Sequence, residues 1–457
     1  MTENNVAAPE KSMRTVATTS LVGTSIEWYD FFIYGTAAAL IFPAAFFPSD
    51  LPPLVGLFAA FGTLAVGFIA RPIGGIVFGH YGDKYGRKKA LVTALMMMGI
   101  ATTLIGCLPT YVLIGPLAPI LLTLLRFTQG LAIGGQWGGA MLLVTENAPA
   151  NKRGFYGAFA QAGAPCGIIL ANLAFLVVGA FVTDEQFIDW GWRIPFLLSV
   201  ILIAMSLFVQ LHIEDTAAFQ ELKKMDTEKR KEESEGSEEV ESPTVKERSP
   251  VIEVIRTHPR EILLAAGAFL SVQVTFYILV AFVIAYGTNI DGLALPREML
   301  LSAVLIASFI QVPILFIASA YSDRHGRRGI YMLGAVLCGV WGFALFPLIE
   351  TGSYLWIVVA ITGGQIFVGM MYGPQAAFLT ELFSTEVRYS GASLGYQLGA
   401  ILGGAFAPLI ATALWIQLGT IYISIYIAFA SLLTLISVMM LTETHGTDLK
   451  TAGAKKA

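Results

Sequence analysis

Long apolar stretches, separated by short polar segments, cover most of this chain. A helix that spans a bilayer needs about 20 predominantly apolar residues. Twelve stretches come close to this requirement: residues 18–45, 54–80, 90–110, 116–144, 155–181, 194–212, 262–288, 298–320, 330–349, 354–380, 390–414 and 419–441. Backbone polar groups inside hydrocarbon must pair within their own segment, so each stretch should be a helix. The pattern predicts an all-α membrane protein with twelve transmembrane helices.

One polar segment is much longer than the others. Residues 213–260 include the run EKRKEESEGSEEVESPTVKERSP, which is charged and free of aromatic residues. Such a composition is typical of a flexible linker, and a plain tether is favoured here over a docking segment. The linker divides the chain into two six-helix bundles, residues 18–212 and 261–442, with tails at 1–17 and 443–457.

Lysine and arginine lie almost entirely on one side of the predicted membrane. If the amino terminus is cytoplasmic, the inner segments hold nearly all of them, and the outer loops hold only Arg193 and Arg297. This asymmetry follows the positive-inside rule. It predicts that both termini are cytoplasmic.

The two halves contain matching motifs. GHYGDKYGRKK (79–89) follows the second helix, and SAYSDRHGRR (319–328) follows the eighth. At the ends of the fourth and tenth helices, a glutamate precedes an arginine by seven residues in both halves. Two matched landmarks in the same order indicate a duplicated six-helix unit.

The charges in these motifs suggest a latch. Asp83 and Asp323 can accept hydrogen bonds from helix N-termini or arginines, and Arg87 and Arg327 can pair with Glu146 and Glu381. Positive-inside topology alone is the simpler alternative, but it requires neither the aspartate nor the glycine. The predicted latch comprises Asp83, Arg87, Glu146, Arg153, Asp323, Arg327, Glu381 and Arg388.

Composition excludes several other classes of protein. Hydrophobic residues make up 56% of the chain and charged residues 13%, against about 25% charged in soluble domains. The net charge of −4 gives no reason to expect nucleic-acid binding. The cysteines and histidines form no metal-ligand spacing, so we expect no metal and no cofactor. The sequence has neither an HExxH motif nor a cysteine–histidine constellation, so an enzyme is not expected.

Four ionisable residues fall inside predicted spans: Glu27, Asp30, Arg71 and Arg126. Such a group costs several kcal/mol in a bilayer and therefore suggests a function. Glu27, Asp30 and Tyr34 are spaced to share one face of the first helix, and Arg126, Gln129 and Gln136 form a similar stripe on the fourth. An arginine could clamp a carboxylate while an acid carries a proton. A structural ion-pair network is the alternative.

The second half has no charge at mid-span. It offers uncharged polar side chains that could contact a substrate or a neighbouring helix. The three favoured for substrate contact are Gln273, Tyr277 and Tyr396.

Four motifs in order resemble the metabolite:proton symporters of the major facilitator superfamily: IEWYDFFIYG (26–35), RPIGGIVFGHYGDKYGRK (71–88), RFTQGLAIGGQWGGA (126–140) and DWGWRIPF (189–196). The resemblance implies two bundles around a central cavity, alternating access and proton-driven uptake. It also implies a bacterial cell membrane as the location. The symporters commonly have glutamate where this chain has Gln136, so coupling would be weakened here or moved to Glu27 or Asp30.

These expectations combine into one functional hypothesis. We predict a monomeric secondary transporter, in contact with the lipid bilayer, that couples protons to uptake of a small carboxylate-bearing metabolite, shikimate-like or dicarboxylate. The expected substrate-binding residues are Arg126, Arg71, Tyr34, Gln129, Gln136, Gln273, Tyr277 and Tyr396, with Asp30 and Glu27 for the proton. A proline or betaine osmolyte symporter and an uncoupled facilitator or exporter are the alternatives. A channel or sensor fits the duplicated latch less well.

Overall fold

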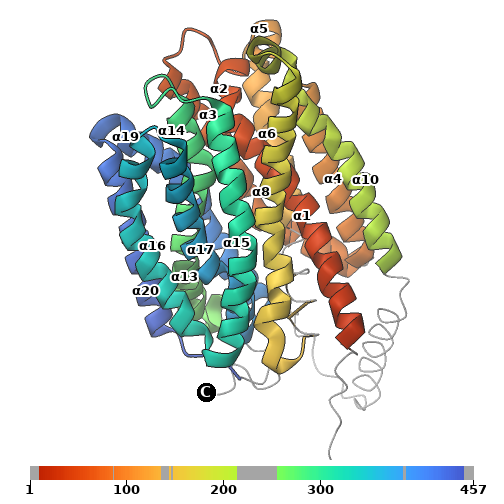
Figure 1. Cartoon of the computed structure of the whole chain (residues 1–457). Coiled ribbons are helices and arrows are strands. Elements are labelled where there is room, and N and C mark those ends of the chain that lie inside the picture. Colours follow the sequence, from red (N-terminus) through yellow and green to blue (C-terminus); the bar gives the residue numbers. More distant parts are fainter. Residues whose placement is uncertain are drawn as a thin grey trace, which may run out of the picture.

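The computed structural model describes the backbone of residues 10–85, 87–134, 141, 144–145, 148–213, 255–383 and 388–446. Side chains are described for the same residues except 10–12, 79–80, 82–91, 205–213 and 388–390. The described residues contain helices and no strand. Most of the long helices run roughly parallel to one another (Figure 1).

The described residues of the first half form six long helices and several short ones. In chain order they are α1 (Glu10–Leu40), α2 (Phe42–Ala45), α3 (Pro53–Tyr85), α4 (Arg87–Cys107), α5 (Tyr111–Ile114), α6 (Leu117–Gly134), η1 (Ala150–Lys152), α8 (Arg153–Phe181), α9 (Asp184–Gln186), η2 (Phe187–Gly191) and α10 (Arg193–Ile213).

The second half repeats this plan. Its elements are α13 (Pro259–Tyr277), η3 (Ile278–Phe282), α14 (Val283–Thr288), α15 (Arg297–His325), α16 (Arg327–Glu350), α17 (Tyr354–Leu382), α18 (Arg388–Gly399), η4 (Ala400–Ala405), α19 (Ala407–Leu418) and α20 (Thr420–Met440).

The helices correspond to the twelve predicted spans. Within the described residues, nine helical stretches are individually long and apolar enough to cross a membrane, and the bent pair formed by α9–η2 and α10 makes a tenth. The apolar part of α4 is shorter, Val92–Cys107. The remaining span is α1, which holds Glu27 and Asp30 within its length.

One predicted span and the predicted linker differ in extent from the observed helices. The predicted span 18–45 is two helices, because α1 ends at Leu40 and α2 starts at Phe42. Pro43 explains the break, since proline lacks an N–H and its ring clashes with the carbonyl four residues earlier. The predicted linker 213–260 is described only at its ends, and α13 already begins at Pro259. Residues 214–254 lie outside the described part of the chain.

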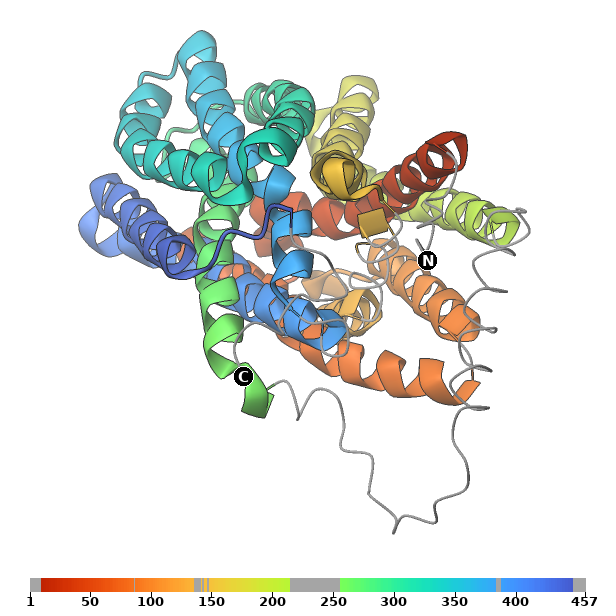
Figure 2. The same ribbon diagram turned by 90° about the horizontal axis from the view of Figure 1, so that it is seen from below.

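The two halves meet along three sets of helices. α8 packs against α15 and α17, α1 against η3 and α14, and α3 against α18, η4 and α19. Seen from below, the helices of the first half (red to yellow-green) lie mainly on one side and those of the second half (green to blue) mainly on the other (Figure 2). The π-helical segments η3 and η4 both lie at this interface, where regular helical hydrogen bonding is interrupted.

Candidate functional site

Two arginines lie at the centre of the first half. Arg71 of α3 is 1% exposed, and Arg126 of α6 is fully buried. Both are near mid-helix, and α3 and α6 pack along their length. The structure therefore places side by side two cations that the sequence puts 55 residues apart.

Aromatic rings cover the flat faces of both guanidinium groups. The Arg126 Cζ lies 4.2 Å from the ring centroid of Phe31 and 4.1 Å from that of Tyr34. The Arg71 Cζ lies 4.4 Å from the centroids of both Phe31 and Phe68. Cation–π contacts of this kind stabilise a desolvated cation. The rings thus replace part of the water that burial removes.

The polar edges of the two groups are mostly unsatisfied. Arg126 Nη1 donates to Gln129 Oε1 at 3.0 Å, and Gln129 Nε2 donates to Thr102 at 2.8 Å. Arg126 Nε and Nη2 have no hydrogen-bond partner among the described residues. The three guanidinium nitrogens of Arg71 form no hydrogen bond of good geometry there either, although the Tyr277 and Tyr396 phenols lie close enough to interact with them. No described carboxylate lies within ion-pair distance of either arginine. Such orphaned donors are uncommon in a folded interior and suggest a site for an anion.

A glycine makes room for Arg126. A Cβ atom on Gly67 of α3 would lie 2.5 Å from Arg126 Nε. The same face of α3 approaches α6 closely at Gly130, where an added Cβ would meet the Ala70 side chain. The small residues of RFTQGLAIGG therefore allow the contact that brings the two arginines together.

Side chains of the second half complete the surroundings of Arg71. Tyr277 of α13, Tyr372 of α17 and Tyr396 of α18 are fully buried or nearly so, and each lies within electrostatic range of Arg71. Gln273 is close to Tyr396. The predicted residues Arg71, Tyr277, Tyr396 and Gln273 are thus brought together across the two halves. Tyr372 joins them, although it was not among the favoured residues.

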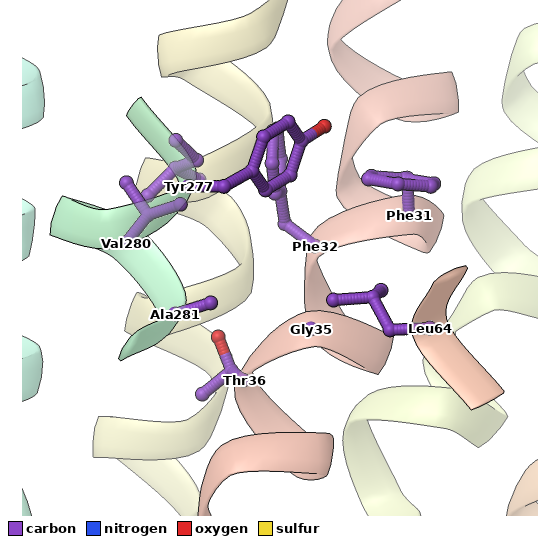
Figure 3. A pocket seen from close by; sticks show the side chains of 9 residues that line it. Phe31, Phe32, Gly35, Thr36, Leu64, Tyr277, Val280 and Ala281 are labelled. Carbon is purple, nitrogen blue, oxygen red and sulfur yellow. The ribbon is translucent and has the colours of Figure 1, made fainter. Parts of the chain in front are cut away.

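A small hollow lies next to the arginines. Its lining comes from α1, α3, α8, α13 and η3, and it has room for about one water molecule. Phe31, Phe32 and Thr36 lie on one side, and Tyr277, Val280 and Ala281 lie on the other (Figure 3). The hollow is therefore at the interface of the two halves, and Phe31 both lines it and contacts the two guanidinium groups. No substrate fits unless the helices move apart.

The predicted acids point elsewhere. Asp30 is 1% exposed, its Oδ1 has no hydrogen-bond partner among the described residues, and it lies near Ser199 of α10. Glu27 is partly exposed. Neither forms an ion pair with Arg71 or Arg126, so the expected pairing of acid and arginine is not found here. Tyr34, which shares their helical face in the sequence, instead contacts Arg126 and donates to Thr63 at 2.6 Å.

At the lower end of Figure 1, a charged cluster joins the two halves. The Asp323 carboxylate accepts hydrogen bonds from the backbone N–H groups of Gly154 and Phe155, both at 2.8 Å. Arg327 donates to Asp323 at 2.5 Å and to Glu381 Oε1 at 3.1 Å. Arg153 of α8 lies 4.0 Å from Glu381. We call Arg153, Asp323, Arg327 and Glu381 the Asp323 cluster.

Three residues after the last helix contribute to this cluster and were assigned to a tail in the sequence. Glu443 accepts from the backbone N–H groups of Arg327, Arg328, Thr444 and His445. Thr444 donates to Glu381 at 2.8 Å, and a ring nitrogen of His445 lies 2.8 Å from the Asp323 carbonyl oxygen. A sequence signal existed, because an acidic residue is the second residue after the sixth predicted span of each half, Glu214 after 194–212 and Glu443 after 419–441.

The opposite end has its own contact between halves. Arg297, the first residue of α15, forms an ion pair with Asp184 of α9, with 2.7 Å between Nη2 and Oδ1. Its Cζ is 3.8 Å from the ring centroid of Phe187. Sequence reasoning missed this contact, because Arg297 counted only as a rare basic residue in an outer loop.

Several predicted site residues cannot be placed. Gln136 and Glu146 lie outside the described residues, as do the side chains of Asp83, Arg87 and Arg388. Of the first copy of the predicted latch, only the Arg153 side chain is therefore part of the structural description. Within the described residues, no group of three or more histidine, cysteine or acidic side chains is arranged to hold a metal.

Residues 391–395, GASLG, match the G-x-S-x-G pattern of hydrolases. In those enzymes the serine lies on a sharp turn between a strand and a helix. Here Gly391–Gly395 lie inside helix α18, so the pattern does not form a nucleophile elbow.

Comparison with known proteins agrees with this architecture. Residues 15–454 match the family described as sugar (and other) transporter. The chain is 39% identical over 447 residues to an inner membrane metabolite transport protein of Escherichia coli K12, covering 96% of this chain and 97% of that protein. It is 40% identical over 402 residues to the shikimate transporter of the same strain, covering 88% and 87% of the two chains. It is 30% identical to the proline/betaine transporter of Salmonella typhimurium LT2, covering 96% of this chain and 85% of that one.

Solved structures give the same fold. A proton:xylose symporter of the major facilitator superfamily superimposes with a TM-score of 0.74 at 16% sequence identity, and the match covers 98% of this chain and 99% of the other. At this identity the likeness establishes the architecture only. The relatives are all transporters rather than enzymes. The chain is a multi-pass membrane protein that belongs to the sugar (and other) transporter family, within the major facilitator superfamily and its metabolite-transporting branch.

Proposed function

We propose that this protein is a proton-coupled symporter for a small carboxylate-bearing metabolite, working by alternating access. The observation that supports it most is the pair of buried guanidinium groups, Arg71 and Arg126, most of whose N–H donors lack a hydrogen bond of good geometry among the described residues. A planar guanidinium edge matches a carboxylate in geometry as well as charge. An acid entering between the halves would satisfy these donors.

The rest of the site supports an acid with hydroxyl groups. Tyr277, Tyr372 and Tyr396 bring phenol groups from the second half close to Arg71. Phenols can donate to or accept from substrate hydroxyls. The 40% identity to a shikimate transporter, over most of both chains, favours a shikimate-like acid over other carboxylates.

Asp30 is the stronger candidate for the proton. It is buried at the level of the hydrophobic core, and Oδ1 has no described partner. Burying an unpaired, ionised carboxylate there costs free energy, and binding a proton removes this cost because it neutralises the group. Since Asp30 does not pair with either arginine, coupling would not proceed by breaking such a pair. Asp30 would instead act through α1, which also carries Phe31 and Tyr34 against Arg126.

The charged residues of the loops and the related proteins together support a location and an orientation for this protein in the membrane. The lysines and arginines of the loops favour a cytoplasmic position for both termini and for the Asp323 cluster. The relatives favour a bacterial inner membrane. We expect the transporter to act as a monomer in the bilayer, because the two halves of one chain already enclose the hollow.

Uptake by proteoliposomes tests this function. Labelled shikimate, a dicarboxylate, proline and glycine betaine would be offered with and without an inward proton gradient. We expect uptake of the acid to rise with the gradient. Equal uptake of the acid under both conditions would favour an uncoupled facilitator and contradict symport.

Arg126→Gln tests the proposed anion contact. Loss of a charge-assisted hydrogen bond costs about 1.5–3 kcal/mol, so the apparent affinity for the acid should fall by at least about tenfold. Arg260→Gln, at an exposed position on α13, is the matched control and should transport like the wild type. Full uptake by Arg126→Gln would remove the arginine from the proposed site.

An osmolyte symporter is a second candidate. The aromatic rings around the hollow could hold a quaternary ammonium by cation–π contact. The faces of Phe31 and Phe68 are already occupied by guanidinium groups, which favours the acid. Uptake of betaine that rises with external osmolality, without uptake of acids, would support the osmolyte function instead.

A further inference from the structure

Phe31 contacts both guanidinium groups of the proposed anion site. Its ring centroid is 4.4 Å from the Arg71 Cζ and 4.2 Å from the Arg126 Cζ, and the side chain is 1% exposed. Among the described residues, no other ring makes a cation–π contact with both cations. The position of this ring therefore affects both arginines at once.

A guanidinium group has chemically different surfaces. Its flat faces are weakly hydrated and stack on aromatic rings, whereas its edge carries the N–H donors. Arg126 has Phe31 and Tyr34 against it, and Arg71 has Phe31 and Phe68. These contacts use none of the N–H groups. The donors stay available in the plane where a carboxylate binds.

The ring of Phe31 is itself held in place. It packs edge-to-face on Phe68 at a centroid distance of 5.3 Å and on Trp28 at 5.6 Å. It also meets Tyr277 of the second half at 6.3 Å. Edge-to-face packing has a preferred geometry, so the ring cannot turn without losing several contacts. The face presented to the arginines is therefore fixed.

From these contacts we infer that Phe31 is a positioning residue for substrate binding: its ring holds the faces of Arg71 and Arg126 so that their free N–H edges can bind one substrate carboxylate. This role rests on the proposed function. Phe31 also lines the hollow, as Tyr277 of the second half does (Figure 3).

Phe31→Leu tests the inference, because leucine keeps an apolar side chain but has no π face. Loss of two cation–π contacts should raise the KM for the acid roughly five- to thirtyfold. The maximal rate should change little, since the helices that move are unaltered. Phe31→Tyr keeps the ring face and should restore a KM near that of the wild type.

Phe32→Leu is the matched control. Phe32 is the next residue, it is also buried, and it also lines the hollow, but it has no cation–π contact with either arginine. Because Phe32 lines the hollow, its substitution can also change the KM for the acid, but the rise should be clearly smaller than for Phe31→Leu, since no cation–π contact with an arginine is lost. An equal rise in KM for Phe31→Leu and Phe32→Leu would mean that only the shape of the hollow matters, and would overturn the inference.

A second measurement needs no substrate. Thermal unfolding in detergent of Phe31→Leu, Arg126→Met and the double variant gives a double-mutant cycle. We expect the two effects to be non-additive, because each substitution removes the same contact. Additive effects, with acid uptake by the wild type intact, would overturn the inference and leave the proposed function standing. Failure of the wild type to take up any acid would sink the proposed function, and with it the role of Phe31 in acid binding.

Discussion

At the scale of single residues, the main feature is how two buried cations are stabilised without anions. Sequence spacing suggested that Glu27 or Asp30 would pair with Arg71 or Arg126. Phe31 lies one position beyond Asp30, which turns it about 100° around the helix. That rotation directs Phe31 toward the arginines and Asp30 toward Ser199 of α10. The cations therefore meet rings rather than carboxylates, and most of their N–H groups can still bind a ligand.

Gly67→Ala tests how tightly Arg126 is placed. An added Cβ would lie 2.5 Å from Arg126 Nε, so the guanidinium must shift away from Phe31 or Tyr34. We expect the apparent affinity for the acid to fall about tenfold or more, because a displaced guanidinium loses its alignment with the carboxylate. Initial uptake rates over a range of acid concentrations measure this.

Gly62→Ala is the control on the same helix, because a Cβ at Gly62 would have no heavy atom within 4 Å. It should transport normally. Similar losses in both variants would point to a general effect on α3 rather than to Arg126.

At the scale of elements, two helices, α8 and α16, are capped by carboxylates from other segments. Asp323, at the end of α15, accepts from the first N–H groups of α8, and Glu443 accepts from those of α16. A helix N-terminus carries unpaired N–H groups and a partial positive charge, so an acid there is stabilising. One cap joins the two halves, while the other joins elements of the second half. Gly326, between α15 and α16, has φ +99°, which favours glycine.

Glu443 gives a pH dependence outside the membrane-spanning segments. Partial burial raises the pKa of its carboxyl, but hydrogen bonds from the backbone N–H groups of Arg327, Arg328, His445 and Thr444 outweigh this and hold the pKa below its ordinary value of 4.5. A depressed folded pKa means that the stabilisation is fully present above about pH 4.5 and is lost as the pH falls through the folded value.

We therefore expect Glu443→Gln to lower the free energy of unfolding at pH 7 by about 0.5–1 kcal/mol, and so to unfold at a lower temperature than the wild type. This loss is at the low end of the range for a helix cap because the site is partly exposed. The difference should shrink as the pH falls below about 4.5, because the wild-type carboxyl is then protonated. Thermal unfolding in detergent at a series of pH values measures it. A difference that does not change with pH would contradict this account of the cap.

At the scale of the whole molecule, the halves are joined at both ends around a small hollow. The Asp323 cluster joins them at one end, and Arg297 with Asp184 and Phe187 joins them at the other. Opening to either side requires one of these contacts to break. Each contact therefore favours the state that is closed at its own end.

Substitutions at the two ends should have opposite effects. Asp323→Asn should favour opening at the end of the Asp323 cluster, and Arg297→Gln should favour opening at the other end. Each substitution should shift the equilibrium between the two open states by about 1 kcal/mol, which changes the ratio of their populations roughly fivefold. Distances between spin labels at the two ends measure the populations.

Glu298→Gln is the control for Arg297→Gln. Glu298 Oε1 lies 2.7 Å from Arg297 Nε, but both residues belong to α15. Losing that ion pair should therefore not change the populations of the two open states. A shift in the same direction for Asp323→Asn and Arg297→Gln would show that the contacts do not oppose one another.

Much of this architecture is determined by the sequence alone. The twelve spans follow from apolar length, because hydrocarbon leaves a backbone no partner except its own helix. Arg71 and Arg126 stood out because a charge at that depth is rarely kept without a use. Asp323, Arg327 and Glu381 were predicted to meet from a repeated motif, and the structure places them together.

Only the tertiary structure decided which surfaces meet across helices. It placed Phe31 against both arginines, closed the hollow with η3, and brought Glu443 and Arg297 into contacts that no local pattern predicted. Hydropathy fixes how long a helix is and how deep it lies, but it says little about rotation about the helix axis. That rotation depends on the side chains of neighbouring helices, which lie far apart in the sequence.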